Sequence, residues 1–305
     1  MQKIIPVFDH SGEPNVGRMP PWIRQQLGAG GHYGVTAQAV HGNGLHTVCE
    51  EARCPNRGEC WSRGTATFML LGDTCTRACG FCAVKTGRPT WSDPQEAERI
   101  AAAVERMGLD YVVLTSVNRD DLPDGGAEVF AACVERLRER RPALGIELLT
   151  PDFHRCQSAA IARVMQAVEA CAAGREVELV WGHNVETVPS LYRVVRKGSD
   201  YRRSLQLLER VSAKPGVEAK SAVMLGLGET REEVVAVLRD LRQVGTARIA
   251  LGQYLRPTPH HLPVKQYVTP EQFDDYAAEA RALGFTWIKA GPLVRSSYHA
   301  EETQA

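Results

Sequence analysis

Six of the nine cysteines in this chain fall into two triplets that lie close together in the sequence. Thiolates grouped this tightly hold soft metals, and iron–sulfur clusters are normally held by four cysteines. Each triplet therefore supplies one ligand too few for a four-iron cluster, which leaves one iron for another partner. An open coordination position is typical of a catalytic metal centre. The triplets are Cys49, Cys54 and Cys60, followed by Cys75, Cys79 and Cys82.

The charge balance excludes several classes of function. With 36 basic and 36 acidic residues among 305, the formal net charge is zero, so no overall field attracts nucleic acid or a membrane surface. No apolar run approaches the about 18 residues that a membrane span needs, and residues 1–14 lack the apolar core of a signal peptide. We therefore expect a cytoplasmic protein, in which thiols stay reduced and clustered cysteines indicate metal or redox chemistry.

A repeated strand–helix pattern is expected to position the cysteines. From residue 67 onward, short apolar β-rich runs alternate with segments of helical period, which is typical of βα units around a parallel sheet. Six such units fit a partial (β/α)6 barrel of the TIM type, and a doubly wound sheet is the alternative. In both folds ligands bind at the carboxyl ends of the strands, and the second triplet directly follows the first strand. The expected strands are 67–72, 110–116, 145–150, 177–182, 217–225 and 247–254.

The chain is expected to divide into three parts. Residues 1–66 lack the strand–helix alternation and are rich in glycine and proline, so they are interpreted as an irregular N-terminal extension that carries the first triplet. Residues 67–284 would form the barrel, and residues 285–305 a C-terminal segment that begins with another apolar run. Three helices are expected to begin at capping sequences headed by Asp93, Thr230 and Thr269.

The CxxxCxxC spacing of the second triplet resembles the radical SAM family. The resemblance implies a 4Fe–4S cluster whose open iron is chelated by S-adenosylmethionine, which an electron from the cluster cleaves to a 5′-deoxyadenosyl radical. It also implies that Phe81 lies beside the adenine and that Asn184 and Glu186 contact the ribose and methionine parts. Asn118 and Asp120 correspond to an amine-binding turn of other members. A zinc knuckle is the alternative for the cysteines.

Longer segments resemble the lipoyl synthase family over nearly the whole chain. They are TVCEEARCPNRGECW, SVNRDDLPDGGAE, ELLTPDF, HNVETVPSLY, MLGLGET, GQYLRPT and the closing GPLVRSSYHA. This resemblance implies that the first triplet holds an auxiliary 4Fe–4S cluster whose fourth ligand is Ser297 of the RSSY motif, with Ser296 as the other possibility. A hydroxyl is a hard partner for soft iron, which suits a cluster that is consumed as a sulfur donor. Asn118 departs from the family, which usually carries Asp there.

The implied activity is insertion of two sulfur atoms at C6 and C8 of an octanoyl chain on a lysine of a lipoyl carrier domain. The carrier would be a 2-oxoacid dehydrogenase E2 or the glycine cleavage H protein. The implied partners also include an electron donor such as ferredoxin or flavodoxin and an iron–sulfur cluster carrier. The alternatives are a methylthiotransferase, a biotin-synthase-like enzyme, a non-catalytic iron–sulfur protein or a zinc-stapled module.

Two further groups of residues are expected to lie outside the chemistry. Cys133, Cys156 and Cys171 are interpreted as packing residues, because free cysteine behaves as a small hydrophobe. A dense basic patch is either a solvated face or a surface that docks an acidic carrier domain. The residues of this patch are Arg193, Arg196, Lys197, Arg202 and Arg203.

Overall fold

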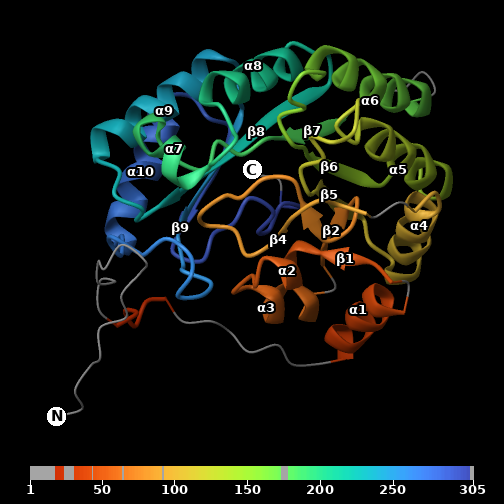
Figure 1. The fold of residues 1–305 in the computed structure, drawn as a ribbon, viewed down its shortest axis with the longest axis horizontal. Coiled ribbons are helices and arrows are strands. Elements are labelled where there is room, and N and C mark those ends of the chain that lie inside the picture. Colours follow the sequence, from red (N-terminus) through yellow and green to blue (C-terminus); the bar gives the residue numbers. More distant parts are fainter. Residues whose placement is uncertain are drawn as a thin grey trace.

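Seven parallel strands lie side by side in chain order in the computed structural model, which describes residues 18–23, 31–42, 44–63, 65–90, 93–172 and 178–302. A two-residue edge strand, β1 (His46–Thr47), pairs antiparallel with β2. A doubly wound sheet would reverse its order at a switch point, so that alternative is wrong and the partial barrel is confirmed (Figure 1). The parallel strands are β2 (Thr67–Leu70), β5 (Tyr111–Ser116), β6 (Gly145–Leu149), β7 (Leu179–Gly182), β8 (Val217–Leu225), β9 (Arg248–Gln253) and β10 (Trp287–Gly291).

The six expected strands are therefore found, although residue 177 lies outside the described residues. The apolar run at 285–288 belongs to the sheet instead of only leading into the tail, because it overlaps β10, which pairs with β9 as a further parallel strand. This pairing fixes the start of the C-terminal segment against the barrel.

Helices cover the outer side of the strands in an arc (Figure 1). Thr230 and Thr269 head α9 and α10 with complete capping boxes, as predicted. Asp93 behaves differently, because its carboxylate accepts from the Gln95 backbone N–H and α4 begins without a side-chain cap. The outer helices are α4 (Glu96–Met107), α5 (Ala127–Arg140), α6 (Gln157–Ala172), α8 (Tyr201–Ser212), α9 (Arg231–Gln243) and α10 (Pro270–Ala282).

Shorter elements surround the ends of the barrel. None of the described helices is both long and apolar enough to cross a membrane. The expectations for residues 1–14 lie outside the described residues. The remaining elements are α1 (Gly31–His41), α2 (Val48–Glu51), α3 (Arg57–Ser62), β3 (Thr74–Cys75), β4 (Lys85–Thr86), the 3-10 helix η1 (Pro189–Leu191) and α7 (Tyr192–Val195).

The two faces of the sheet differ in chemistry. Along β5, Val112 and Leu114 join the main core beneath the helices, which is the alternation expected of a strand. The inner face is more polar: Tyr111 donates a hydrogen bond to Glu147, which also forms an ion pair with Lys220 at 2.7 Å. The side chains of Glu147 and Lys220 are 0% and 1% exposed. This buried ion pair therefore occupies space inside the barrel that apolar side chains could otherwise fill.

Candidate metal centres

The second triplet lies at the carboxyl ends of β2 and β5. Cys75 ends the short strand β3, and its sulfur accepts backbone N–H groups from Arg77 at 3.4 Å and from Asn118 at 3.3 Å. Asn118 follows β5, so the loop that carries the cysteines is tied to the next strand of the barrel. Hydrogen bonds to a ligating sulfur tune the potential of an iron–sulfur cluster, and Cys75 already has two.

The electrostatic surroundings of the second triplet favour a bound metal cation. Burial raises the pKa of the Cys79 thiol to about 11, and a neighbouring Cys75 thiolate adds to the rise although Arg196 opposes it. Burial also raises the pKa of Cys82 to about 12, again with repulsion from the other two sulfurs. Three thiolates are thus unfavourable together unless a cation replaces their protons, which is what a bound metal does.

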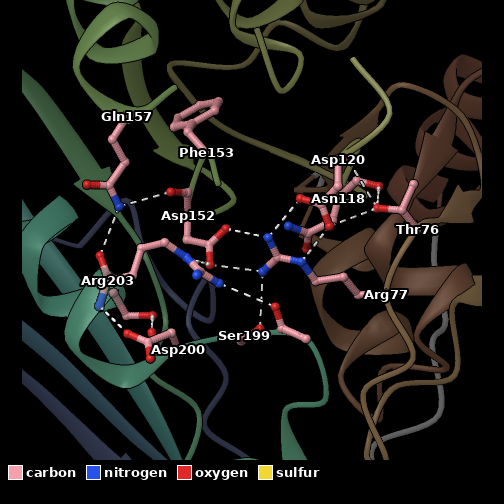
Figure 2. A network of polar contacts seen from close by, with 12 residues as sticks. Thr76, Arg77, Asn118, Asp120, Asp152, Phe153, Gln157, Ser199, Asp200 and Arg203 are labelled. Carbon is pink, nitrogen blue, oxygen red and sulfur yellow. Dashed lines mark hydrogen bonds and ion pairs between the residues drawn. The ribbon is translucent and has the colours of Figure 1, made fainter. Parts of the chain in front are cut away.

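An arginine inside the cysteine loop holds that loop to the barrel (Figure 2). All five N–H donors of Arg77 are used: two to Asp120, two to Asp152 and one to the Ser199 hydroxyl. Asp152 follows β6 and is fully buried, and Arg203 of α8 reaches its other side at 2.8 Å. The loop is therefore fastened to three neighbouring segments through one guanidinium.

The pKa of Asp152 reflects this arrangement. Burial alone would raise it, but hydrogen bonds and charge from Arg77 hold it well below its usual range. Asp152 is thus a permanent anion that compensates two arginines. A carboxylate that forms charge-assisted hydrogen bonds with two arginines fixes the orientation of both guanidinium groups.

Asn184 and Glu186 follow β7 and lie near the second triplet. Glu186 has φ +65° and is held there by β8, with which its backbone forms a bridge at Val223. A left-handed backbone at a residue other than glycine is strained, and such strain collects at functional sites. Burial raises the pKa of the Glu186 carboxyl, and Arg196 and Asn184 act against that rise.

An orphaned polar atom fits a bound cofactor at this position. Asn184 donates to Glu186 at 3.1 Å, but its own side-chain oxygen is buried with no hydrogen-bond partner among the described residues. A buried acceptor of this kind costs free energy unless a ligand supplies a donor. An ammonium or hydroxyl group meets that need.

The other predicted cofactor residues have distinct surroundings. Phe81 packs against the apolar cluster of Leu227 and Tyr254, next to the turn after β8. Asn118 contributes its backbone, since its N–H reaches Cys75 and its carbonyl accepts from Thr76. The Asp120 carboxylate accepts from Arg77 and Thr76. Its role in the structure is to hold the cysteine loop, and direct contact with a cofactor stays a prediction for it and for Phe81.

The first triplet lines a cavity at the opposite end of the strands. Cys49, Cys54 and Cys60 meet there with Ser297 and Arg295, around about 500 Å³ of empty space that includes space open to solvent. Residues near the starts of β2 and β5 form the wall. Ser296 is absent from the lining of this cavity.

The C-terminal tail closes this cavity. The Ser297 hydroxyl accepts a hydrogen bond from Thr67, the first residue of β2, at 2.9 Å. Tyr298 donates to Glu59 of α3 at 3.0 Å, and Asn56 donates to the Leu293 carbonyl at 2.6 Å. The tail and the N-terminal extension are therefore joined around the first triplet.

The first triplet has the same electrostatic character as the second. Burial raises the pKa of Cys49 to about 11, with a further rise from a Cys54 thiolate. Burial raises the pKa of Cys60 to about 12, with added repulsion from both other sulfurs. Three thiols and a hydroxyl on one cavity form a donor set that fits an iron–sulfur cluster closed by a weak fourth ligand.

Arg295 interacts electrostatically with residues of both sites. Burial lowers the pKa of its guanidinium, and charges at Cys54 and at Glu186 both act to raise it. One residue is thus within electrostatic reach of the first triplet and of the cofactor residues after β7. The sites are separated along the barrel by β2, whose four residues span roughly 13 Å.

The sequence missed the partners of the cysteine loop. An ion pair of Arg77 could have been predicted, because a charged residue between two closely spaced cysteines needs a counter-ion. The sequence alone does not identify the acidic residue that supplies it. Arg196 was placed wrongly on the basic patch: it is buried, donates to Tyr192 and Ser204, and lies near Cys79. Cys133 is buried in the core as predicted, and Cys156 and Cys171 are half-buried.

Comparisons with known proteins agree with this geometry. The model of the radical SAM superfamily matches residues 69–241. The lipoyl synthase of Methylococcus capsulatus is 52% identical over 302 residues, which cover 99% of this chain and 90% of that protein. The lipoyl synthases of Chlorobium limicola and Klebsiella pneumoniae subsp. pneumoniae are 51% and 50% identical; each alignment covers 93% of this chain, and 94% and 86% of the two relatives.

Solved structures support the fold alone. SuiB of Streptococcus suis, bound to its precursor peptide SuiA, superposes with a TM-score of 0.52 at 15% identity, covering 73% of this chain and 48% of SuiB. HydG, a maturase of the FeFe-hydrogenase, gives a TM-score of 0.50 at 13% identity, covering 71% of this chain and 54% of HydG.

Proposed function

Because the chain belongs to the lipoyl synthase family of the radical SAM superfamily, we propose that it inserts two sulfur atoms at C6 and C8 of a protein-bound octanoyl chain. The observation that carries this proposal is the pair of three-thiol sites at opposite ends of one short strand. One such site would be enough for electron transfer or hydrogen abstraction. Sulfur insertion also needs a sulfur donor, and that donor must face the same carbon chain.

The second triplet would hold the cluster that binds S-adenosylmethionine. Together these groups supply the radical hydrogen abstraction that C–H bonds without acidity require. The chain's own contribution is placement: Cys75, Cys79 and Cys82 offer three ligands, and Asn184 and Glu186 offer acceptors for the amino and hydroxyl groups of the cofactor. Arg77 keeps the loop that bears the ligands in register with the barrel.

The first triplet would hold an auxiliary cluster that supplies sulfur. Ser297 is the favoured fourth ligand, because it lines the cavity of Cys49, Cys54 and Cys60, whereas Ser296 does not. A hydroxyl ligand would bind iron weakly beside three thiolates, so Ser297 would hold the corner at which an auxiliary cluster could give up sulfur. Thr67 holds the hydroxyl in place through its hydrogen bond.

The octanoyl chain would lie inside the barrel between the two triplets. Two C–H bonds are replaced, so two equivalents of S-adenosylmethionine are consumed for each lipoyl group. The acyl chain would enter on a lysine of a carrier domain, from a 2-oxoacid dehydrogenase E2 or the glycine cleavage H protein. A ferredoxin or flavodoxin would supply electrons, and a cluster carrier would rebuild the auxiliary cluster in the cytoplasm.

One assay tests the activity directly. Anaerobically reconstituted protein is incubated with an octanoyl-lysine peptide, S-adenosylmethionine and dithionite, and the products are read by mass spectrometry. Thiolated and then lipoylated peptide is expected. Peptide that stays octanoylated, or a colourless protein that binds zinc, would refute the proposal.

Variants separate the two sites. Replacing Cys49, Cys54 and Cys60 together by alanine should leave cleavage of S-adenosylmethionine intact and abolish sulfur insertion. Ser297→Ala should impair insertion, with Ser296→Ala as the matched control because the two serines are neighbours of the same size. An equal loss in both serine variants would remove the assignment of Ser297.

A further inference from the structure

We propose that a basic rim beside the cysteine loop docks an acidic face of the carrier protein. The proposal rests on the function proposed above and identifies where the protein substrate binds. The basic rim consists of Arg155, Lys197, Arg202, Arg203 and Arg210.

A cavity forms the centre of the basic rim. It lies between the start of α6 and one side of α8, and its empty space of about 730 Å³ includes space open to solvent. Arg155, Arg203 and Arg210 line it, and no carboxylate does. Three guanidinium groups that share one opening repel each other, so a site of this composition favours anionic side chains.

The cations of the rim are poorly neutralised by the chain itself. Arg155, Lys197 and Arg202 are exposed and form no ion pair within the described part of the chain. Among the described residues, Arg210 donates only to the Ser158 hydroxyl. Arg203 is the one rim cation of the described chain whose side chain pairs with a carboxylate, the buried Asp152 that it shares with Arg77, while Asp200 accepts from the Arg203 backbone N–H.

Arginines on the outer helices show that the fold supplies acids elsewhere. Arg140 of α5 forms ion pairs with Glu98 and Glu105 of α4. Arg163 of α6 forms ion pairs with two glutamates of α5. Those arginines have acidic partners, whereas the three arginines that line the cavity of the rim share an opening that no carboxylate lines.

The rim adjoins the site at which the substrate must react. Arg203 and Arg77 approach Asp152 from opposite sides (Figure 2). Arg203 also donates to the Gly198 carbonyl, next to Lys197, and the Gly80 N–H of the cysteine loop donates to Val195. A protein seated on the rim would therefore present a lysine arm beside the second triplet.

Carboxylates on the partner would be recognised through charge and direct hydrogen bonds. Guanidinium groups bind carboxylates in a bidentate fashion, and attraction between surfaces of opposite charge accelerates encounter. Such attraction weakens as salt screens it. Binding of the carrier should accordingly depend on salt, whereas turnover of a short neutral peptide should not depend on the rim.

The test reverses three exposed charges that take no part in the ion-pair network. The variant Arg155→Glu/Lys197→Glu/Arg202→Glu is compared with the control Arg106→Glu/Arg239→Glu/Arg281→Glu, whose exposed cations lie on α4, α9 and α10. Anisotropy of a labelled octanoylated carrier domain measures affinity, and mass spectrometry measures turnover of an uncharged octanoyl-lysine peptide.

The rim variant should bind the carrier at least about tenfold more weakly at low salt, and the difference should shrink at about 0.3 M salt. Peptide turnover and iron content should match those of the unsubstituted enzyme, and the control should bind normally. Unchanged affinity, an equal loss in the control, or failure of the unsubstituted enzyme to bind the carrier would overturn the docking proposal. Tight carrier binding without any lipoyl product would instead refute the proposed activity.

Discussion

Replacing Arg77 by alanine should destabilise the protein and loosen the cysteine loop. The side chain of Arg77 is 3% exposed, and that of its partner Asp152 is fully buried. Removing the guanidinium would leave Arg203 as the one ion-pair partner of Asp152 among the described residues. Asp120 would lose its partner as well, but its side chain is 31% exposed and can be hydrated.

The magnitude follows from the buried charge. Breaking a buried ion pair by removing one partner costs about 3 to 5 kcal/mol, chiefly because the other charge is stranded. Since Arg203 still compensates Asp152 and water reaches Asp120, we expect the lower end, about 3 kcal/mol. Adding Asp152→Asn to the alanine variant removes the stranded charge and should recover at least about 1 kcal/mol.

Urea unfolding of the reduced apoprotein under nitrogen measures these free energies. Arg136→Ala is the matched control, because Arg136 pairs with Glu139 on the exposed face of α5 and should show no measurable loss. The same variants are then reconstituted in a background that lacks the first triplet. Arg77→Ala should incorporate less iron there than the parent, and its reduced cluster should give an altered electron paramagnetic resonance spectrum.

Two outcomes would contradict a role of Arg77 as the counter-ion of Asp152. A loss of stability no larger than that of the control would mean that Arg77 does not compensate Asp152. A double variant less stable than Arg77→Ala alone would mean that the charge of Asp152 is not the source of the cost.

Three further perturbations test other parts of the structure. Burial lowers the pKa of His183 to about 4, so the unfolded chain binds a proton at this histidine before the folded chain does. Roughly 3 kcal/mol of stability should therefore be lost as the pH falls from about 7 to 4. Urea unfolding of His183→Gln, measured over the same pH range, should lack this loss. A Cβ at Gly252 would lie 2.0 Å from the Val294 carbonyl oxygen, so Gly252→Ala should displace the tail and remove about half of the roughly eight irons per chain that the two proposed clusters would hold, whereas full iron content would contradict this. Lys220→Met strands the buried Glu147 and should cost about 3 to 5 kcal/mol in urea unfolding, most of which a second substitution of Glu147 by glutamine should restore.

The repeating part of the fold could be predicted from the sequence because it depends on local pattern. Apolar β-rich runs marked six of the seven parallel strands, all but β10, and threonine followed three residues later by Glu or Gln marked the starts of α9 and α10. The cysteine spacings identified the two sets of thiols for the same reason, since each triplet is short enough for its members to meet without knowledge of the rest of the chain.

What escaped prediction depends on contacts between distant segments. Arg77 and Asp152 are 75 residues apart, and only the closure of the barrel brings them together. Arg196 looked like part of a surface patch because its neighbours are basic, yet it follows the end of α7 and its side chain is buried against Tyr192. The position of the first triplet at the starts of β2 and β5 depends likewise on how the tail returns to Thr67.

If the first triplet holds the sulfur donor, the sulfur that enters the product comes from its cluster. The most direct measurement reconstitutes the protein with heavy-isotope sulfide, removes the excess, and runs a single turnover on octanoyl-lysine peptide in buffer that contains ordinary sulfide. Both sulfur atoms of the lipoyl product should then carry the heavy isotope. Product that carries ordinary sulfur from the buffer would contradict it.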